Sequence, residues 1–285
     1  MKNFAAVFVL LLLVVPGFAR TRAAAKAHPD HVHSAHHSVQ FFNEHNTFQF
    51  ESSLNFQIKG DSVQVSYPSF LFRYGLLNYL ELRLAFDLAS TKEGSHSDII
   101  TGITPLQPGF KIKFNEPQAA RHIPAFAVTG SVTVPKAASV VNRQTYWAPV
   151  FNFSAEQDIT DKLSFEYAAG MKWDADNFQR TYFGSVNMEF DATKKFTVYA
   201  DAYIFKTEQT KMDIRTDIGF NRLLNKWMQL DLSVGTGLNN YSPDFFMTAG
   251  IQFAAKSKSR AIQKSTRTQS VKESGKRTNS SGAGK

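Results

Sequence analysis

The stretch WMQLDLSVGTGLNNYSPDFFMTAGIQF, residues 227–253, decides the fold because its side chains alternate with a period of two. Even positions in 228–234 are apolar, and odd positions in 229–237 are polar or glycine. After a polar break at 239–243, the odd positions in 245–253 are apolar. A period of two is typical of β-strands, and two strands joined by a turn form a hairpin.

The same alternation recurs along the chain from Asn46 onward. The clearest segment carries five apolar residues at even positions, Leu80, Leu82, Leu84, Phe86 and Leu88. A helix would scatter these side chains around its surface, whereas a strand places them all on one face. The pattern predicts about twelve strands of roughly nine to thirteen residues, the length that a tilted strand needs to cross a bilayer.

The first residues have the features of a secretion signal. Lys2 is followed by an apolar run at 4–15, then by a helix-breaking Pro16 and small residues at 17 and 19. The run is shorter than the ~20 apolar residues of a membrane-spanning helix, so a cleaved signal peptide is predicted over 1–19, with cleavage as late as 27 as the alternative. Absent cysteine fits an exported protein that has no disulfides.

An exported chain with alternating strands and no later apolar helix can span a membrane only as a closed barrel, which satisfies every backbone polar group internally. The sequence therefore predicts an all-β, antiparallel, up-and-down transmembrane β-barrel over 46–253. A His-rich flexible leader is expected at 20–45 and a basic disordered tail at 254–285. An even strand number places both termini in the periplasm of a Gram-negative bacterium, with the barrel in its outer membrane.

The net charge of +8 resides entirely in the tail, which holds nine Lys/Arg and one acid after Phe253. The rest of the chain is neutral, which excludes a nucleic-acid-binding surface on the barrel. The expected partners are outer-membrane lipid, a small-molecule solute, and the barrel-assembly machinery, which would recognise the C-terminal strand ending at Phe253.

The leader concentrates histidines at positions 28, 31, 33, 36 and 37. Two interpretations stay open. Neutral imidazoles on a flexible peptide bind Zn, Cu or Ni, so His28, His31, His33, His36 and His37 are candidate metal ligands. Their spacing matches no fixed structural site, so a low-complexity leader is the alternative. No cofactor is predicted.

If the apolar face meets lipid, the opposite face lines the lumen. The candidate selectivity residues on that face are Glu51, Glu81, Arg83, Asp87, Lys111, Lys113, Glu166, Lys172, Glu189, Tyr199, Asp201, Asp213, Arg215, Asp217 and Asp231. Buried charges at this density must pair or stay hydrated. They form either a salt-bridge ladder that fills a narrow barrel or a polar path whose charge balance sets selectivity.

Catalysis finds little support in the sequence. The only histidines of the predicted barrel are His96, between two serines of a loop, and His122, in a turn, and no third orienting residue accompanies either. No phosphate loop or dinucleotide fingerprint occurs. The chain is therefore predicted not to be an enzyme, and a barrel hydrolase acting on lipids is the alternative.

The run Arg73-Tyr74-Gly75-Leu76, followed by Glu81-Leu82-Arg83, resembles the family described as "Putative MetA-pathway of phenol degradation". Further similarity lies at 108–111, 132–135, 217–219 and 229–237, and the chain departs from the family at Lys136, where a glycine is usual. The resemblance implies an outer-membrane barrel transporter, and the family name associates it with phenolic compounds. The predicted function is a passive channel for small solutes, aromatic ones among them, with a closed structural barrel as a further alternative.

Overall fold

The computed structural model describes residues 45–92, 98–115, 123–208, 210–225 and 227–256. Outside these residues lie the predicted signal peptide, the His-rich leader with its candidate metal ligands, His96, His122 and most of the basic tail.

The described chain is all-β, as predicted, with one short 3-10 helix, η3 (Val140–Asn142). Its strands are β1 (Thr47–Lys59), β2 (Ser62–Leu77), β3 (Leu80–Lys92), β4 (Ile100–Ile103), β5 (Gln107–Lys113), β6 (Ala125–Thr133), β7 (Ala148–Asp158), β8 (Leu163–Trp173), β9 (Arg180–Thr193), β10 (Phe196–Thr207), β11 (Asp213–Asn225), β12 (Met228–Gly237) and β13 (Phe245–Lys256). Among the described residues, no helix is long and apolar enough to cross a membrane.

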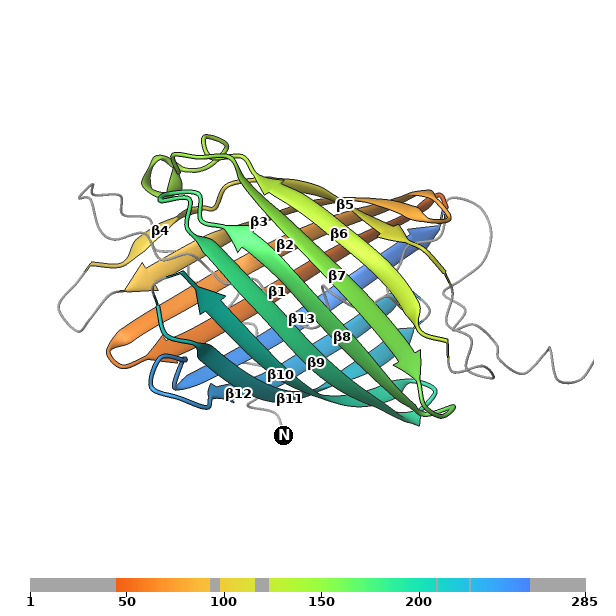
Figure 1. The fold of residues 1–285 in the computed structure, drawn as a ribbon. Helices are drawn as coiled ribbons and strands as arrows, with labels where there is room; N and C mark the ends of the chain where they lie inside the picture. The colour runs from red at the N-terminus through yellow and green to blue at the C-terminus, as the bar shows by residue number, and fades with distance from the viewer. Residues whose placement is uncertain (1–44, 93–97, 116–122, 209, 226, 257–285) are drawn as a thin grey trace, which may run out of the picture.

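The strands form one antiparallel sheet in chain order, and β1 pairs with β13 to close it into a barrel (Figure 1). Because β4 and β5 both pair with β3, they are two halves of one interrupted strand, and the thirteen strands occupy twelve positions around the barrel. This confirms the predicted architecture. The last strand continues past Phe253, because Ala254, Ala255 and Lys256 still pair with the start of β1.

The break between β4 and β5 lies at Pro105, which has no N–H to donate to the sheet. The amide of Leu106 bonds instead to the carbonyl of Ala137, 3.1 Å away, in the segment that carries η3. Sequence alternation indicated only the second half of this strand, because four residues are too few to establish a period.

Strand β2 contains a register shift between Ser66 and Ser69, around Pro68. The shift inverts the alternation: Ser66 is buried on the inner face before it, and Arg73 is buried on the same face after it. A proline cannot donate to the ladder, and a bulge absorbs the extra residue. Phe70 and Phe72 thereby point outward, although the residues around Pro68 show no clear period of two.

Large apolar side chains cover the outer face of the barrel. Aromatic rings from adjacent strands contact one another there, with centroids 5.0 Å apart for Phe50 and Phe72 and 5.3 Å apart for Phe70 and Phe86. Ile218 is 58% exposed and Phe151 is also exposed. An apolar surface of this kind around a closed barrel is the surface that faces hydrocarbon in outer-membrane barrels.

The two ends of the barrel differ. One, called here the turn end, has both termini of the described barrel and short connections such as 78–79 and 194–195. The other, called the loop end, has mostly longer segments, including 134–147 between β6 and β7, together with the two-residue turn 60–61. At this end, Arg180 donates to Glu208 over 2.7 Å and holds the pKa of that carboxyl below its usual range.

Candidate functional site

The lumen is the only part of the described chain where charged side chains gather out of solvent. All the predicted lumen residues occupy inward-facing positions of their strands: Glu51 on β1, Glu81, Arg83 and Asp87 on β3, Lys111 and Lys113 on β5, Glu166 and Lys172 on β8, Glu189 on β9, Tyr199 and Asp201 on β10, Asp213, Arg215 and Asp217 on β11, and Asp231 on β12. Strand pairing and parity fix these directions, because successive side chains point to opposite faces.

Three cations, Arg73 on β2, Arg83 on β3 and Lys111 on β5, define what we call the basic wall. Arg73 binds Glu81 with two nitrogens, Nε to Oε1 at 2.9 Å and Nη2 to Oε2 at 3.2 Å. Its Nη1 donates to Glu51 Oε1 at 2.8 Å, so a single guanidinium is shared by two carboxylates. The side chains of Arg73 and Glu81 are 1% and 0% exposed, and buried bidentate pairs of this kind are strong and geometrically specific.

Lys111 links the basic wall to the opposite side of the lumen. It is fully buried, and its charged neighbours are Arg73, Arg83, Glu81 and, on β8, Glu166. Strands β6 and β7 separate β5 from β8, so the attraction between Lys111 and Glu166 acts across the lumen rather than between neighbouring strands.

Six carboxylates on the adjacent strands β7 to β12 define the acidic wall: Glu156, Glu166, Glu189, Asp201, Asp217 and Asp231. Two pairs are directly opposite on neighbouring strands, Glu156 with Glu166 and Asp201 with Asp217. Like charges in such cross-strand positions repel each other.

The acidic wall has few cations of its own. On strands β7 to β12 the inward-facing Lys and Arg residues are Lys172 and Arg215, both toward the loop end. Arg215 already binds Asp213, with Nε 3.0 Å from Oδ1, and also donates to Gln57. On this wall, Glu166 is also attracted by Lys111 from the basic wall.

Two tyrosines of β10 donate hydrogen bonds to this wall. The Tyr199 hydroxyl lies 2.9 Å from Asp231 Oδ2, and the Tyr203 hydroxyl lies 3.2 Å from Asp217 Oδ2. The Tyr199 ring lies against the backbone of β11 at Gly219, where an added Cβ would be 2.4 Å from the ring. Glycine is therefore required at 219 to let the ring lie flat against the barrel.

Neutral oxygens at the same wall lack donors. Asn187 on β9 is 5% exposed, and its Oδ1 has no hydrogen-bond partner within the described part of the chain. It is directly paired with Glu166 on one side and Asp201 on the other. Ser154 Oγ on β7 is equally buried and also has no partner among these residues.

An aromatic cluster lines the lumen between the acidic wall and the loop end. Phe183, Tyr203 and Phe205 pack together with Val150, and the Arg215 guanidinium lies over the Phe205 ring at 5.0 Å. These rings provide apolar faces inside an otherwise polar interior, which suits contact with a flat or amphipathic solute.

Sequence reasoning missed Arg73 and Phe205 as lumen residues, and it placed Asn187 on the polar face of its strand without assigning it a role. Arg73 was hidden by the register shift at Pro68, although counting back from Glu81 across the β2–β3 turn would have placed it inside. Asn187 and Phe205 carry no charge and thus gave no signal of function. Over the described ranges, no three His, Cys, Asp or Glu side chains are close enough to hold a metal ion.

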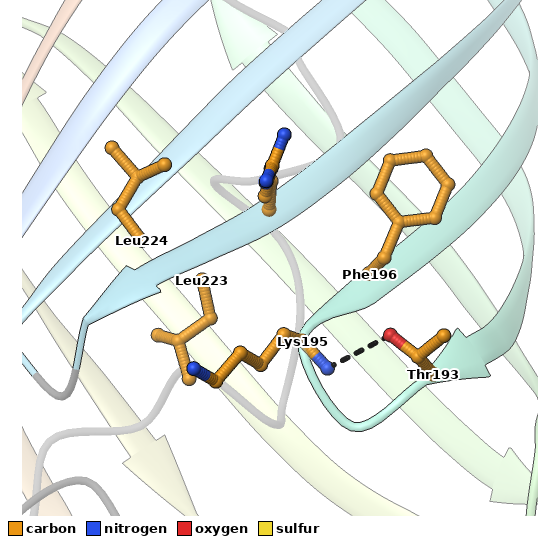
Figure 2. Close-up of a pocket in the computed structure, with 6 residues that line it drawn as sticks. Thr193, Lys195, Phe196, Leu223 and Leu224 are labelled. Atoms are coloured by element: carbon orange, nitrogen blue, oxygen red, sulfur yellow. Dashed lines mark hydrogen bonds between the residues drawn. The ribbon is translucent and has the colours of Figure 1, made fainter.

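A separate pocket lies at the turn end, at the rim of the barrel. Figure 2 shows its lining from the β9–β10 turn and the end of β11: Thr193, Lys195, Phe196, Arg222, Leu223 and Leu224. The backbone N–H of Lys195 donates to Thr193 Oγ1 at 3.2 Å and shapes the turn. The pocket is distinct from the two charged walls.

Comparison with known proteins agrees with this architecture. The family described as "Putative MetA-pathway of phenol degradation" matches residues 33–255, which confirms the resemblance noted in the sequence. No curated protein matches the chain.

Solved structures share the fold at low identity. An outer membrane channel from Pseudomonas putida F1, of the COG4313 group, is 12% identical with a TM-score of 0.56, over 81% of this chain and 100% of that one. The KdgM porin is 14% identical with a TM-score of 0.51, over 72% of this chain and 98% of that one. The NanC porin has the same TM-score and coverage at 7% identity.

Proposed function

Because the chain belongs to the family described as "Putative MetA-pathway of phenol degradation", we propose that it is a passive outer-membrane channel for small solutes. The observation that carries the proposal is the division of the barrel into an apolar outer face and a lumen with a basic wall opposite an acidic wall. Solutes would diffuse along the lumen, and no covalent step is involved. The similar structures are a porin and an outer membrane channel, which supports the same function.

We place the turn end, with both termini, in the periplasm and the loop end outside the cell. Bacterial outer-membrane barrels have short periplasmic turns and longer external loops, and the 134–147 segment is of the longer kind. The barrel-assembly machinery would recognise β13, whose Phe253 faces lipid beside Phe50 of β1 at 6.4 Å between ring centroids.

Aromatic solutes are included in the proposed range. The cluster of Phe183, Tyr203 and Phe205 supplies ring faces inside the lumen, and offset or edge-on ring contacts are favourable there. The family description, which refers to phenol degradation, points in the same direction.

A closed structural barrel is the competing function that one observation favours. Arg73, Glu81 and Lys111 are at most 1% exposed, so these side chains fill the lumen around them. A hydrolase has no comparable support, since the single histidine of the described residues, His45, bonds to the Leu76 carbonyl at the turn end.

Planar-bilayer conductance of the purified full-length chain separates the channel from the closed barrel. We expect discrete single-channel steps, and a larger step for Lys111→Ala, because the lysine side chain occupies the path. Ile218→Ala, on the lipid face, is the matched control and should leave the step size unchanged. Absence of conductance from both the native chain and Lys111→Ala, together with no swelling of liposomes in phenol, sugars or divalent metal salts, would identify a closed barrel.

A further inference from the structure

We propose that the acidic wall makes this channel selective for cations, and that its preferred organic solutes carry an ammonium group. The inference deepens the proposed function and rests on it, because selectivity has meaning only if the lumen conducts. Three features of the lumen support the inference independently of one another.

The first feature is the distribution of counter-charges. On the basic wall, Arg73 is bound by Glu51 and Glu81, so that wall includes its own acids within hydrogen-bond distance. The acidic wall has six carboxylates, whereas its own strands have two inward-facing cations, Arg215, which is bound by Asp213, and Lys172 toward the loop end. A cation that passes through the lumen is therefore attracted to one side and meets a largely neutralised surface on the other.

The second feature is an excess of hydrogen-bond acceptors. Asn187 Oδ1, Glu166 Oε1 and Ser154 Oγ are buried and have no donor within the described part of the chain. Buried polar atoms are normally satisfied, so these oxygens favour an occupant that brings N–H groups. An ammonium group has up to three donors and no acceptor, whereas a carboxylate solute would add further acceptors.

The arrangement of these oxygens also distinguishes an organic cation from a bound metal. Across the described residues, no three carboxylate or histidine side chains converge on one point. The carboxylates are instead distributed over six neighbouring strands, from Glu156 on β7 to Asp231 on β12. Such a distribution supports a cation that moves from one contact to the next rather than one that is held in a chelating site.

The third feature is the aromatic cluster beside the wall. The Arg215 guanidinium lies 5.0 Å from the centre of the Phe205 ring, which shows that this surface accommodates a cation over a ring face. Tyr203 joins the aromatic cluster to the acidic wall, because its ring packs with Phe205 and its hydroxyl donates a hydrogen bond to Asp217. A solute with an aromatic ring and an ammonium group could contact both at once.

Reversal potentials across planar bilayers test the sign of the selectivity. Under a KCl gradient, the native channel should pass K⁺ in preference to Cl⁻. Glu166→Gln and Asp201→Asn should each lower this permeability ratio about two- to three-fold, the scale expected for one unit charge acting across a narrow water-filled lumen. Lys111→Gln should raise the ratio, and Glu208→Gln, in an exposed loop-end ion pair, should leave it unchanged.

A pair of permanently charged solutes tests the chemical class on the native chain alone. Benzyltrimethylammonium chloride and sodium benzenesulfonate have similar rings and opposite fixed charges, and the former should permeate faster under bi-ionic conditions. Benzylammonium should permeate faster still, because it can donate to Asn187 and Glu166 where the trimethylated ion cannot.

Equal or anion-favouring permeability, with normal single-channel steps, would overturn cation selectivity while leaving the channel function intact. If benzylammonium permeates no faster than benzyltrimethylammonium, the buried oxygens of Asn187 and Glu166 do not take part in selecting the solute. A complete lack of conductance would instead refute the proposed function from which the inference proceeds.

Discussion

Replacing Arg73 with methionine removes a guanidinium that donates hydrogen bonds to two carboxylates, the buried Glu81 and the partly buried Glu51. Glu81 loses contacts of 2.9 and 3.2 Å and Glu51 loses one of 2.8 Å, in a region where Arg73 and Glu81 are almost completely inaccessible. Breaking a buried ion pair by removing one partner costs about 3–5 kcal/mol, because the remaining charge stays desolvated. Arg83 Nε still lies 3.5 Å from Glu81 Oε1, so we expect a loss toward the lower end, about 3 kcal/mol.

The free energy of unfolding can be measured by urea titration of the barrel in lipid vesicles, with tryptophan fluorescence as the signal. Arg73→Met/Glu81→Met should recover part of the loss, because it removes the buried Glu81 carboxylate, while the less buried Glu51 keeps its hydrogen bond from Gln252. Arg180→Met, which removes an exposed partner of Glu208 at the loop end, is the matched control and should lower the free energy of unfolding far less than Arg73→Met.

A loss below about 1 kcal/mol for Arg73→Met would mean that water reaches Glu81 in the folded barrel, contrary to its burial. Failure of Glu81→Met to rescue the variant would mean that Arg73 stabilises through packing alone. Either result would refute the conclusion that ion pairs of Arg73 with Glu81 and Glu51 stabilise the barrel.

Three further outcomes follow from the structure. Ile218→Arg, which places a charge on the lipid face of β11, should destabilise the barrel in vesicles by up to about 2–4 kcal/mol, with Ile218→Leu as control. Gly235→Val should lower the thermal unfolding temperature, because a Cβ at that position would lie 2.2 Å from the Phe246 ring and 2.6 Å from Asp217 Cβ. A Phe246→Ala background should relieve part of the effect, because it removes the first of these contacts. Hydrogen bonds from Arg180 lower the pKa of Glu208 in the folded state, so they stabilise the fold at pH values above the ordinary carboxylate pKa. This stabilisation is lost as the pH falls through the lowered pKa of Glu208. An NMR titration of Glu208 with a midpoint at or above about 4.3 would contradict this.

The strands could be predicted from sequence because each has one face in lipid and one in a polar lumen, which gives a strong period of two. The period of two did not predict the structure where a proline interrupts the backbone hydrogen bonds of the sheet. At Pro68 a register shift moved Arg73 to the inner face, and at Pro105 the strand was divided into β4 and β5. In both places the local loss of a backbone donor outweighed the pattern of side chains.

Contacts within the lumen were less predictable than the strands. The alternation of polar and apolar residues predicts that a side chain points into the lumen. It does not predict which residue that side chain contacts, because contacts across the lumen depend on how the sheet closes. Lys111 and Glu166 are separated by 55 positions in sequence and by two intervening strands, yet they attract each other directly. Several acidic side chains lie within reach of a long side chain such as Arg73. Only the three-dimensional arrangement shows that Arg73 hydrogen bonds to both Glu51 and Glu81.

The order of the strands in the sequence nevertheless predicts where charged residues lie around the lumen, which the alternation within a single strand does not. In an up-and-down barrel, position in sequence becomes position around the axis, because each strand pairs with the next. The basic wall comes from residues 73–111 and the acidic wall from residues 156–231, so a separation of charge along the chain becomes a separation of charge across the lumen. Moving a lysine from β5 to an inward position of β9, for example by combining Lys111→Asn with Asn187→Lys, preserves composition and net charge while removing the asymmetry. If asymmetry rather than net charge governs permeation, this exchange should alter cation preference, and if it does not, total lumen charge alone determines selectivity.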